Sequence, residues 1–210
     1  MRYPPRHREQ TKKRILQSAR ALFNRHGFTD VSIDDVMEHA GLTRGGFYTH
    51  FATKSALYAE TVGLALAETP WSRGDGIAAR DVARQIIEAY LSQQHIDDLE
   101  RACPMLTLPS DVARSDDALV RDAFEKVFSA MAGLFEEGLN RNGRADRTRA
   151  LAMASLCVGA MVVARALRSD ELSSSIREAA KETVLAMGGW QREASSRRSA
   201  APMKPQRRKK

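Results

Sequence analysis

Apolar residues recur at intervals of three and four along most of this chain of 210 residues, and that spacing limits its fold more than any other feature. The clearest example is segment 116–141, where Val, Phe, Met and Leu residues follow one another at this interval. The interval places side chains on one face of an α-helix, whereas a half-buried strand alternates apolar and polar residues. No segment alternates over a useful length, so we predict an all-α chain with about nine helices.

Capping residues and glycines divide the N-terminal part of the chain into short helices. Ser32 stands before an apolar residue and two acids, which suits a helix N-terminus, and Thr43 and Thr53 stand in similar capping positions. Gly27 and Gly41 follow helical segments and can end them. The predicted helices cover residues 9–26, 32–40, 43–51 and 54–69.

Longer helices are predicted beyond residues 70–76, which read PWSRGDG and are rich in turn formers. These helices cover residues 77–95, 103–113, 116–141, 147–167 and 173–187, and Pro109 interrupts the second. We therefore expect an N-terminal domain of residues 9–69 and a C-terminal domain of residues 70–190. Residues 191–210 are mostly Arg, Lys, Ser, Ala and Pro, and we expect them to form a basic, disordered tail.

The net charge of +7 is unevenly distributed: residues 1–60 carry +4, residues 61–190 carry −4 and residues 191–210 carry +7. A basic head on a mildly acidic body is typical of a polyanion-binding module carried by a partner module, although +4 over 60 residues also lies within ordinary scatter. The acidic body would repel a polyanion from the end of the protein opposite the basic head. The basic tail would add affinity for a polyanion that depends on salt concentration and not on the sequence of the polyanion.

Features that direct a protein to other compartments are weak. The two cysteines suit a reducing compartment, and the N-terminal MRYPPRHREQ has no apolar run typical of a secretory signal. The uncharged apolar run 151–164 is shorter than the roughly 20 residues of a membrane-spanning helix. We expect a soluble cytoplasmic protein.

Segment 32–51, SIDDVMEHAGLTRGGFYTHF, has the form of a helix-turn-helix, in which the second helix enters the major groove of DNA. Phe47 and Phe51 would face inward against the first helix. Gly45 and Gly46 would let the backbone approach DNA closely, at a cost in helix propensity of about 1 kcal/mol each. The remaining side chains of the second helix can donate hydrogen bonds to bases and phosphates; these are Arg44, Tyr48, Thr49 and His50.

The first 69 or so residues resemble the DNA-binding domain of tetracycline-repressor (TetR) family transcriptional regulators. The resemblance rests on ALFNRHGF at the end of the first helix, then SIDDVMEHAGLT, then RGGFYTHF, then KSALY. In that family the third helix contacts the major groove. The resemblance implies base or phosphate contacts for one set of residues: Thr43, Arg44, Gly45, Gly46, Tyr48, Thr49, His50 and Lys54. For Lys54 it implies a phosphate contact, which its place at a helix start also favours.

The same resemblance implies that the C-terminal helices form a homodimer and hold an effector. Segment 151–164 is apolar nearly all round, with small residues that favour close helix approach, namely Ala150, Ala154, Gly159 and Ala160. With segment 173–187 it could form a four-helix interface between two copies, although a buried helix of a monomer has the same pattern. A dimer would present its recognition helices about 34 Å apart to a palindromic operator.

We expect a hydrophobic or aromatic effector, because few charges interrupt these helices. Large or adaptable side chains in the middle of the domain are the candidates to bind it, although such side chains more often belong to the core than to the wall of a pocket. They are Trp71, Tyr90, Phe124, Phe128, Met131, Phe135, Met153 and Met161. The effector would release DNA by favouring a conformation with the wrong spacing between recognition helices.

Other classes of protein are less consistent with this sequence. No metal-spaced His/Cys set, Gly-rich phosphate loop or nucleophile elbow is present, so we expect no enzyme, cofactor or metal site. A non-specific architectural DNA-binding protein stays open as an alternative. A redox- or electrophile-sensing regulator is another, because Cys103 precedes Pro104 at a predicted helix start, where the helix dipole can lower the pKa of a thiol.

Overall fold

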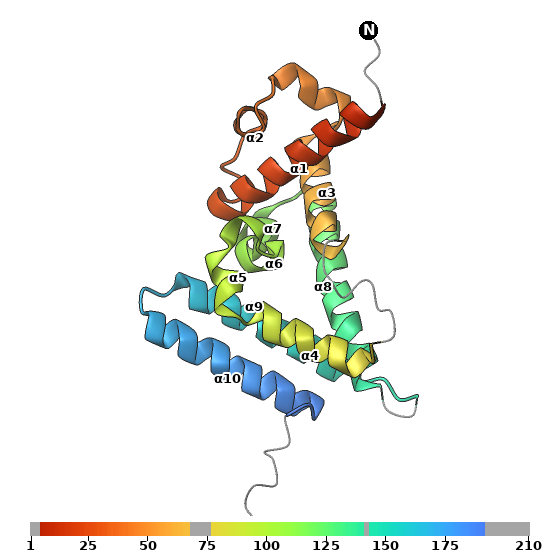
Figure 1. Ribbon diagram of the computed structural model, residues 1–210, viewed down its shortest axis with the longest axis vertical. Helices are drawn as coiled ribbons and strands as arrows, with labels where there is room; N and C mark the ends of the chain where they lie inside the picture. The colour runs from red at the N-terminus through yellow and green to blue at the C-terminus, as the bar shows by residue number, and fades with distance from the viewer. Residues whose placement is uncertain (1–4, 68–76, 141–142, 192–210) are drawn as a thin grey trace, which may run out of the picture.

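The computed structural model describes residues 5–67, 77–140 and 143–191, and these are helical with short connections (Figure 1). The prediction of an all-α fold is confirmed. Two predicted helices are each broken in two, 77–95 after Tyr90 and 103–113 at Pro109. The elements are α1 Pro5–His26, α2 Ile33–His39, η1 Arg44–Thr49, α3 Lys54–Ala67, α4 Ala79–Tyr90, α5 Gln93–Asp97, η3 Leu99–Arg101, α6 Pro104–Thr107, α7 Pro109–Arg114, α8 Ala118–Leu139, α9 Arg147–Ala166 and α10 Asp170–Gly188.

We call α1, α2, η1 and α3 the head. Its core is built from one face of each helix, because apolar residues three and four apart converge between α1, α2 and α3. Phe23 of α1 and Tyr58 of α3 pack with tilted rings 6.0 Å apart, and Phe28 lies edge-on to Tyr58 at 5.0 Å. Aromatic pairs at these distances stabilise the packing beyond their buried area.

The second half of α1 is held by the segment from η3 to α7. The side-chain amide of Asn24, which is 2% exposed, donates to the carbonyls of Leu99 at 3.1 Å and Ala102 at 2.9 Å. Just beyond α1, the backbone N–H of Phe28 donates to a carboxylate oxygen of Asp111 at 2.9 Å. These polar contacts therefore fix how the end of α1 lies against the segment from η3 to α7.

We call α4 to α10 the body. Within it α8 contacts α3 of the head as well as α4 and α9, so that this helix adds a second connection between the head and the body. At Gly138 of α8 a Cβ would lie 2.8 Å from that of Ala83 in α4, which shows how closely these two helices cross. The indole of Trp190, only 1% exposed, closes the same end of the body against Gly188.

Helix α9 is long and apolar enough to cross a membrane by length and composition, with a mean hydropathy of 1.5. It packs against α8 and α10 and buries Met153, Cys157 and Met161 completely, as the core helix of a globular protein does. Three of the small residues expected to allow close approach, Ala150, Ala154 and Ala160, are also buried within the chain, while Gly159 is exposed. The small residues thus mainly serve packing inside this chain.

Helix α10 carries a buried cation, Arg177, which is 3% exposed. Its guanidinium donates to the carbonyl of Leu91 at 3.1 Å and to Oε1 of Gln93 at 2.5 Å. Leu91 follows α4, where the last carbonyls of a helix carry partial negative charge. The helix end therefore compensates the cation and ties α10 to the turn between α4 and α5.

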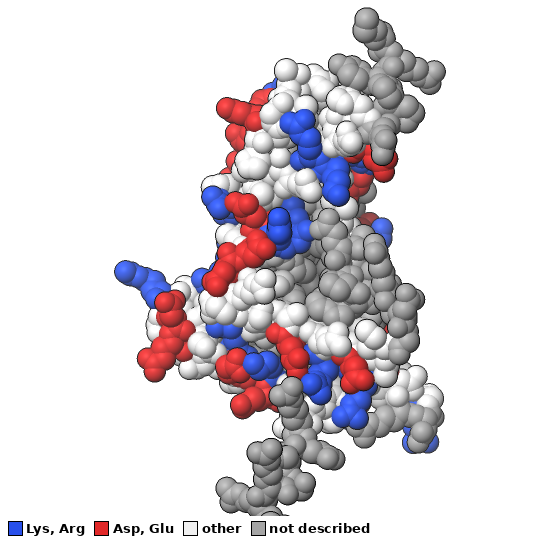
Figure 2. Space-filling model, viewed as in Figure 1, with Lys and Arg blue, Asp and Glu red and all other residues white. Residues whose placement is uncertain are grey.

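The head and the pair α9–α10 lie at opposite ends of the long axis of the molecule (Figure 1). Figure 2 shows Lys and Arg beside Asp and Glu on both the upper and the lower part of the same face. The net charge of +4 over residues 1–60 therefore does not form a continuous basic patch on this face. The basic tail, residues 191–210, lies outside the described residues apart from Gln191.

Candidate nucleic-acid interface

A capping box fixes the start of α2. The Ser32 hydroxyl accepts from the N–H of Asp35 at 3.1 Å, and the Asp35 carboxylate accepts from the N–H of Ser32 at 2.7 Å. Two otherwise unpaired backbone donors are satisfied in this way. The hydrogen bonds from Ser32 hold the pKa of Asp35 below its ordinary value. The predicted cap is confirmed, as is that of Thr53, whose hydroxyl accepts from the N–H of Ala56.

The element after the turn is a 3₁₀ helix, η1, rather than the expected α-helix. Thr43 stands at its N-cap without a side-chain hydrogen bond, so the predicted capping role is wrong. Gly45 and Gly46 near its start lower α-helix propensity, which favours a short, tighter segment. Phe47 is fully buried and Phe51 is 3% exposed, so the predicted inward face is confirmed.

Arg44 and Tyr48 form the outward face of η1. Tyr48 is 57% exposed. Arg44 is exposed and pairs with the carboxylate of Asp34 on α2. Its hydrogen bond with Tyr48 and the charge of Asp34 raise the pKa of Arg44 above its ordinary value. These contacts hold a permanent cation and a phenol together at the surface of the head.

The two glycines differ in their surroundings. A Cβ at Gly45 would meet no other atom within 4 Å, whereas one at Gly46 would lie 3.5 Å from Cε of Met37. Neither glycine has a positive φ. Nothing within the described chain therefore requires glycine at position 45.

Thr49 and His50 are less available than the sequence suggested. The Thr49 hydroxyl donates to the carbonyl of Gly46 at 2.7 Å. His50 is partly buried, and burial followed by the charges of Arg8 and Lys12 lowers its pKa. A neutral imidazole still offers one hydrogen-bond donor but no charge for a phosphate.

Lys54 lies against the turn after α1. Its ammonium donates to the carbonyl of Thr29 at 3.2 Å and stands 4.6 Å from the centre of the Phe28 ring. Burial lowers its pKa, against the opposing charges of Asp30, Asp35 and Asp111. A phosphate contact stays a prediction and would use the ammonium donors that Thr29 leaves free.

Arg8 is a candidate that sequence reasoning missed. Its guanidinium donates to the carbonyl of Thr49 at 3.0 Å, so the start of α1 lies beside the end of η1. Lys12, one turn later, pairs with Glu60 at 2.6 Å and stands over the Phe51 ring. Basic residues four apart, near the N-terminal end of the first helix, were the signal in the sequence, although only the fold places them beside η1.

The candidate effector residues are mostly core. Tyr90, Met131, Phe135, Met153 and Met161 are buried between α4, α8 and α9. Phe124 and Phe128 are partly buried against the same cluster. Trp71 lies outside the described residues.

Two buried phenols have no hydrogen-bond partner within the described residues. These are the hydroxyls of Tyr58 on α3 and Tyr90 on α4. Burial is the main cause that raises the pKa of Tyr90 well above its ordinary value, and the neighbouring Cys103 and Cys157 add to the rise. Both tyrosines are therefore neutral polar groups without partners in an apolar core, which is an unfavourable arrangement for a purely structural residue.

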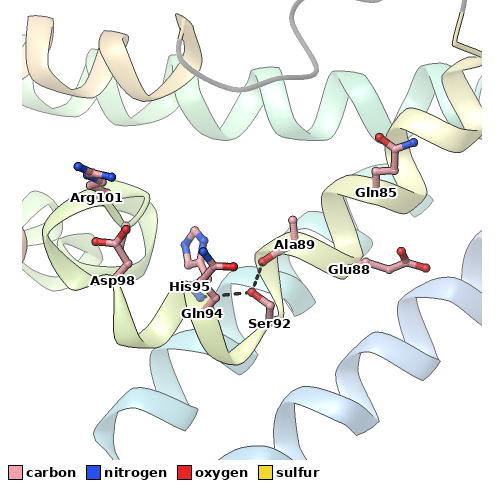
Figure 3. A pocket seen from close by; sticks show the side chains of 9 residues that line it. Gln85, Glu88, Ala89, Ser92, Gln94, His95, Asp98 and Arg101 are labelled. Atoms are coloured by element: carbon pink, nitrogen blue, oxygen red, sulfur yellow. Dashed lines mark hydrogen bonds between the residues drawn. The ribbon is translucent and has the colours of Figure 1, made fainter.

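A hollow of about 610 Å³ opens between α4 and the η3 segment (Figure 3). Gln85 and Glu88 of α4 lie on one side and Asp98 and Arg101 on the other, with His95 between them. Its lining is more polar than the predicted effector residues, and none of those residues lines it. Within the described ranges, no group of three or more His, Cys, Asp or Glu side chains is arranged to hold a metal ion.

The expected lowering of the Cys103 pKa is wrong. Burial raises the pKa of this thiol to about 11, and only smaller effects from the Met105 backbone and Arg20 oppose the rise. Its helix α6 has four residues, too short for an appreciable dipole. Burial also raises the pKa of Cys157 to about 12. Both cysteines are protonated thiols near neutral pH, which reduces their reactivity.

The fold and this surface are those of an all-helical protein with an N-terminal helix-turn-helix. The family model described as "Bacterial regulatory proteins, tetR family" matches residues 15–61. MftR of Mycobacterium tuberculosis, described as a putative mycofactocin biosynthesis transcriptional regulator, is 42% identical over 52 residues. The HTH-type transcriptional regulator AcrR of Shigella flexneri is 38% identical over 52 residues. Residues 15–61 are therefore similar to regulatory proteins of the tetR family.

These matches leave most of the chain uncovered. They span 25% of this chain, 26% of MftR and 24% of AcrR, so the chain covers about a quarter of the length of these curated relatives. The matched part holds the whole helix-turn-helix and no residue of the body.

Alignments with solved structures also cover the body and show a shared fold. NemR of E. coli in its reduced form aligns with a TM-score of 0.68 at 19% identity, over 83% of this chain and 95% of NemR. SmeT in complex with triclosan aligns with a TM-score of 0.63 at 19% identity, over 93% of this chain and all of SmeT. The body therefore has the fold of these two proteins.

Proposed function

We propose that the protein is a homodimeric transcriptional repressor that binds a palindromic DNA operator and is released by a small hydrophobic or aromatic effector. The observation that supports DNA binding best is the outward face of η1. An exposed guanidinium and an exposed phenol stand beside Gly45, at a position where a glycine has no intramolecular purpose. Arginine and tyrosine there can contact base edges and phosphates while the backbone lies close to the groove.

The test is to select duplexes from a random-sequence library and to compare the selected duplex with its scrambled form across a salt series. A specific regulator should bind the selected site about 10³-fold tighter or more. An approximate two-fold symmetry in the selected site is also expected. Equal affinities for both duplexes would instead favour an architectural DNA-binding protein.

The surface of α9 and α10 supports the homodimer. From Leu151 to Ala166, each exposed residue of α9 is uncharged. Helix α10 carries a similar stripe of exposed, uncharged residues spaced three or four apart. These residues are Leu172, Ser175, Ala179, Thr183 and Ala186. Adjacent uncharged stripes on neighbouring helices are typical of an interface with a second copy.

Val163 and Ile77 provide a matched test of the dimer, because they are 49% and 50% exposed and lie on different surfaces. Val163→Asp should shift the protein toward monomer in analytical ultracentrifugation and weaken operator binding. Ile77→Asp should leave both unchanged. A Val163→Asp protein that sediments like the wild type would place the interface elsewhere.

An effector is supported by the body fold and by the aromatic and methionine-rich core between α4, α8 and α9. SmeT, which has the same fold, was solved with triclosan, a hydrophobic aromatic compound. Release of the selected operator can be followed by fluorescence polarisation with triclosan and other aromatic compounds, and with glucose as a polar control. Release by glucose alone would contradict the proposed effector class.

A further inference from the structure

We propose that the hydroxyl of Tyr90 is the polar anchor of a buried site for a neutral ligand with one hydrogen-bonding group, entered through the hollow at His95. This inference rests on the proposed effector function and specifies its chemistry. Tyr90 is one of the side chains expected to bind the effector, and the inference adds that its hydroxyl selects the ligand.

The first step is the unpartnered hydroxyl. Tyr90 is 7% exposed and its Oη has no partner among the described residues. A buried hydroxyl without a partner destabilises a protein by about 1–3 kcal/mol, and phenylalanine would fill the same space without that cost. A tyrosine at this position is explained if Oη bonds to something that enters the body.

The second step is access. The ring of Tyr90 lies 4.8 Å from the ring of His95, and His95 also lines the hollow (Figure 3). His95 is thus a side chain that contacts both the ring of Tyr90 and the hollow. Tyr58, the other unpartnered phenol, instead packs among Phe23 and Phe28, away from the residues that line this hollow.

The third step is the weak attachment of His95. Its Nε2 accepts from the N–H of Cys103 at 3.4 Å, a long distance for a hydrogen bond. It belongs to α5, a helix of five residues of which none is fully buried. A rotation of this ring would connect the hollow to Tyr90 at small cost.

The fourth step is charge. The groups around the phenol are the neutral His95 ring and two protonated thiols, Cys103 and Cys157. The charge of Arg20 acts on His95 and Cys103, whereas among the described residues neither a cation nor a carboxylate shifts the pKa of Tyr90 itself. The charged residues Glu88, Asp98 and Arg101 line the outer hollow. The anchor therefore suits an uncharged hydroxyl or carbonyl on an apolar ring.

The test uses 2-naphthol and naphthalene, which share a ring system and differ by one hydroxyl. In equilibrium dialysis with the full chain, the wild type should bind 2-naphthol at least about five-fold tighter than naphthalene, as one added hydrogen bond to a buried group implies. Tyr90→Phe should bind naphthalene as the wild type does and lose the preference for 2-naphthol. Tyr58→Phe, which removes the other unpartnered phenol, is the matched control and should keep this preference.

Two further measurements separate this role from a structural one. If Oη lacks a protein partner, the melting temperature of ligand-free Tyr90→Phe should equal or exceed that of the wild type, and a clear decrease would contradict the proposal. His95→Ala should speed association of 2-naphthol in stopped-flow experiments, and a slower association would contradict the proposed entrance.

The inference can fail while the proposed function stands. A preference for 2-naphthol that survives in Tyr90→Phe, or the absence of binding of both probes to the wild type, would overturn the anchor. Selection of a specific operator does not depend on either result, because it uses the ligand-free protein.

Discussion

The side chain of Asn24 on α1 donates a hydrogen bond to the carbonyl of Ala102, 78 residues further along the chain, at 2.9 Å. The same amide bonds the carbonyl of Leu99, and its Oδ1 accepts from the hydroxyl of Thr107 at 2.9 Å. One buried side chain in the head therefore satisfies groups on both sides of the turn into α6. That turn also carries the Cys103 amide, which bonds His95.

Asn24→Ala should destabilise the protein by about 2–4 kcal/mol, because it leaves two carbonyls and one hydroxyl without their buried partner. Urea unfolding measures this loss. Asn24→Asp should be worse at neutral pH, since a carboxylate would face the carbonyls of Leu99 and Ala102. Asn140→Ala, at an exposed position after α8, is the control and should change stability little. An Asn24→Ala protein as stable as the wild type would show that the network is not stabilising.

His95 should make stability depend on pH. Burial, followed by the charge of Arg20, lowers its pKa from 6.5 to about 4, while Asp98 opposes the change. Below pH 6.5 the unfolded chain binds a proton that the folded protein excludes, so this contribution to stability is complete above that pH and is lost as the pH falls toward 4. The loss between pH 7.5 and pH 5 should be about 2 kcal/mol.

Urea unfolding at these two pH values is the measurement. His95→Gln, which retains an acceptor for the Cys103 amide, should remove most of the loss. His39→Gln, at an exposed position on α2, should retain it. If wild-type stability is the same at both pH values, the His95 ring does not lie in the buried environment described above.

Deletion of residues 191–210 should make the salt dependence of DNA binding shallower. This segment has a net charge of +7, and each phosphate that a Lys or Arg neutralises releases counterions and steepens that dependence. The preference for the selected operator over its scrambled form should not change, because phosphate contacts are blind to sequence. A charge-neutral tail of the same length, with Lys, Arg and Glu193 replaced by Gln, separates charge from chain length. An unchanged slope would make the tail irrelevant to DNA binding.

Sequence patterns predicted the elements that depend on local interactions. Ser32 and Asp35 form their capping box within four residues, and Phe47 and Phe51 face inward because of their spacing alone. The positions of Arg8 and Lys54 could not be predicted in this way. Arg8 bonds a carbonyl 41 residues away, and Lys54 bonds one 25 residues away, so both depend on how α1, η1 and α3 pack.

The body shows the same limit. The apolar spacing of α8 and α9 predicted buried helices, yet it could not distinguish core residues from the lining of a site. The unpartnered hydroxyl of Tyr90 makes that distinction, and it is visible only once each neighbour of the phenol is known. Cys103 shows the converse, because its place before Pro104 suggested a reactive thiol while burial raises its pKa.

Gly45→Ala should separate folding from DNA binding. A methyl group at this position meets no atom within 4 Å, and the backbone there does not require glycine. The substitution should therefore raise the free energy of unfolding by up to about 1 kcal/mol, since alanine has less conformational freedom to lose. In the proposed complex the same methyl group would stand between the backbone and the DNA, so affinity for the selected operator should fall about ten-fold or more, as measured by fluorescence polarisation.

Gly133→Ala is the matched control, because Gly133 lies in α8 with nothing within 4 Å of an added Cβ. It should give a similar gain in stability with no change in operator affinity. A loss of affinity that accompanies lower stability in Gly45→Ala would point to misfolding of η1. Unchanged affinity in a stable Gly45→Ala protein would mean that η1 does not approach DNA through this glycine, and the contact would then have to come from the side chains of Arg44 and Tyr48 alone.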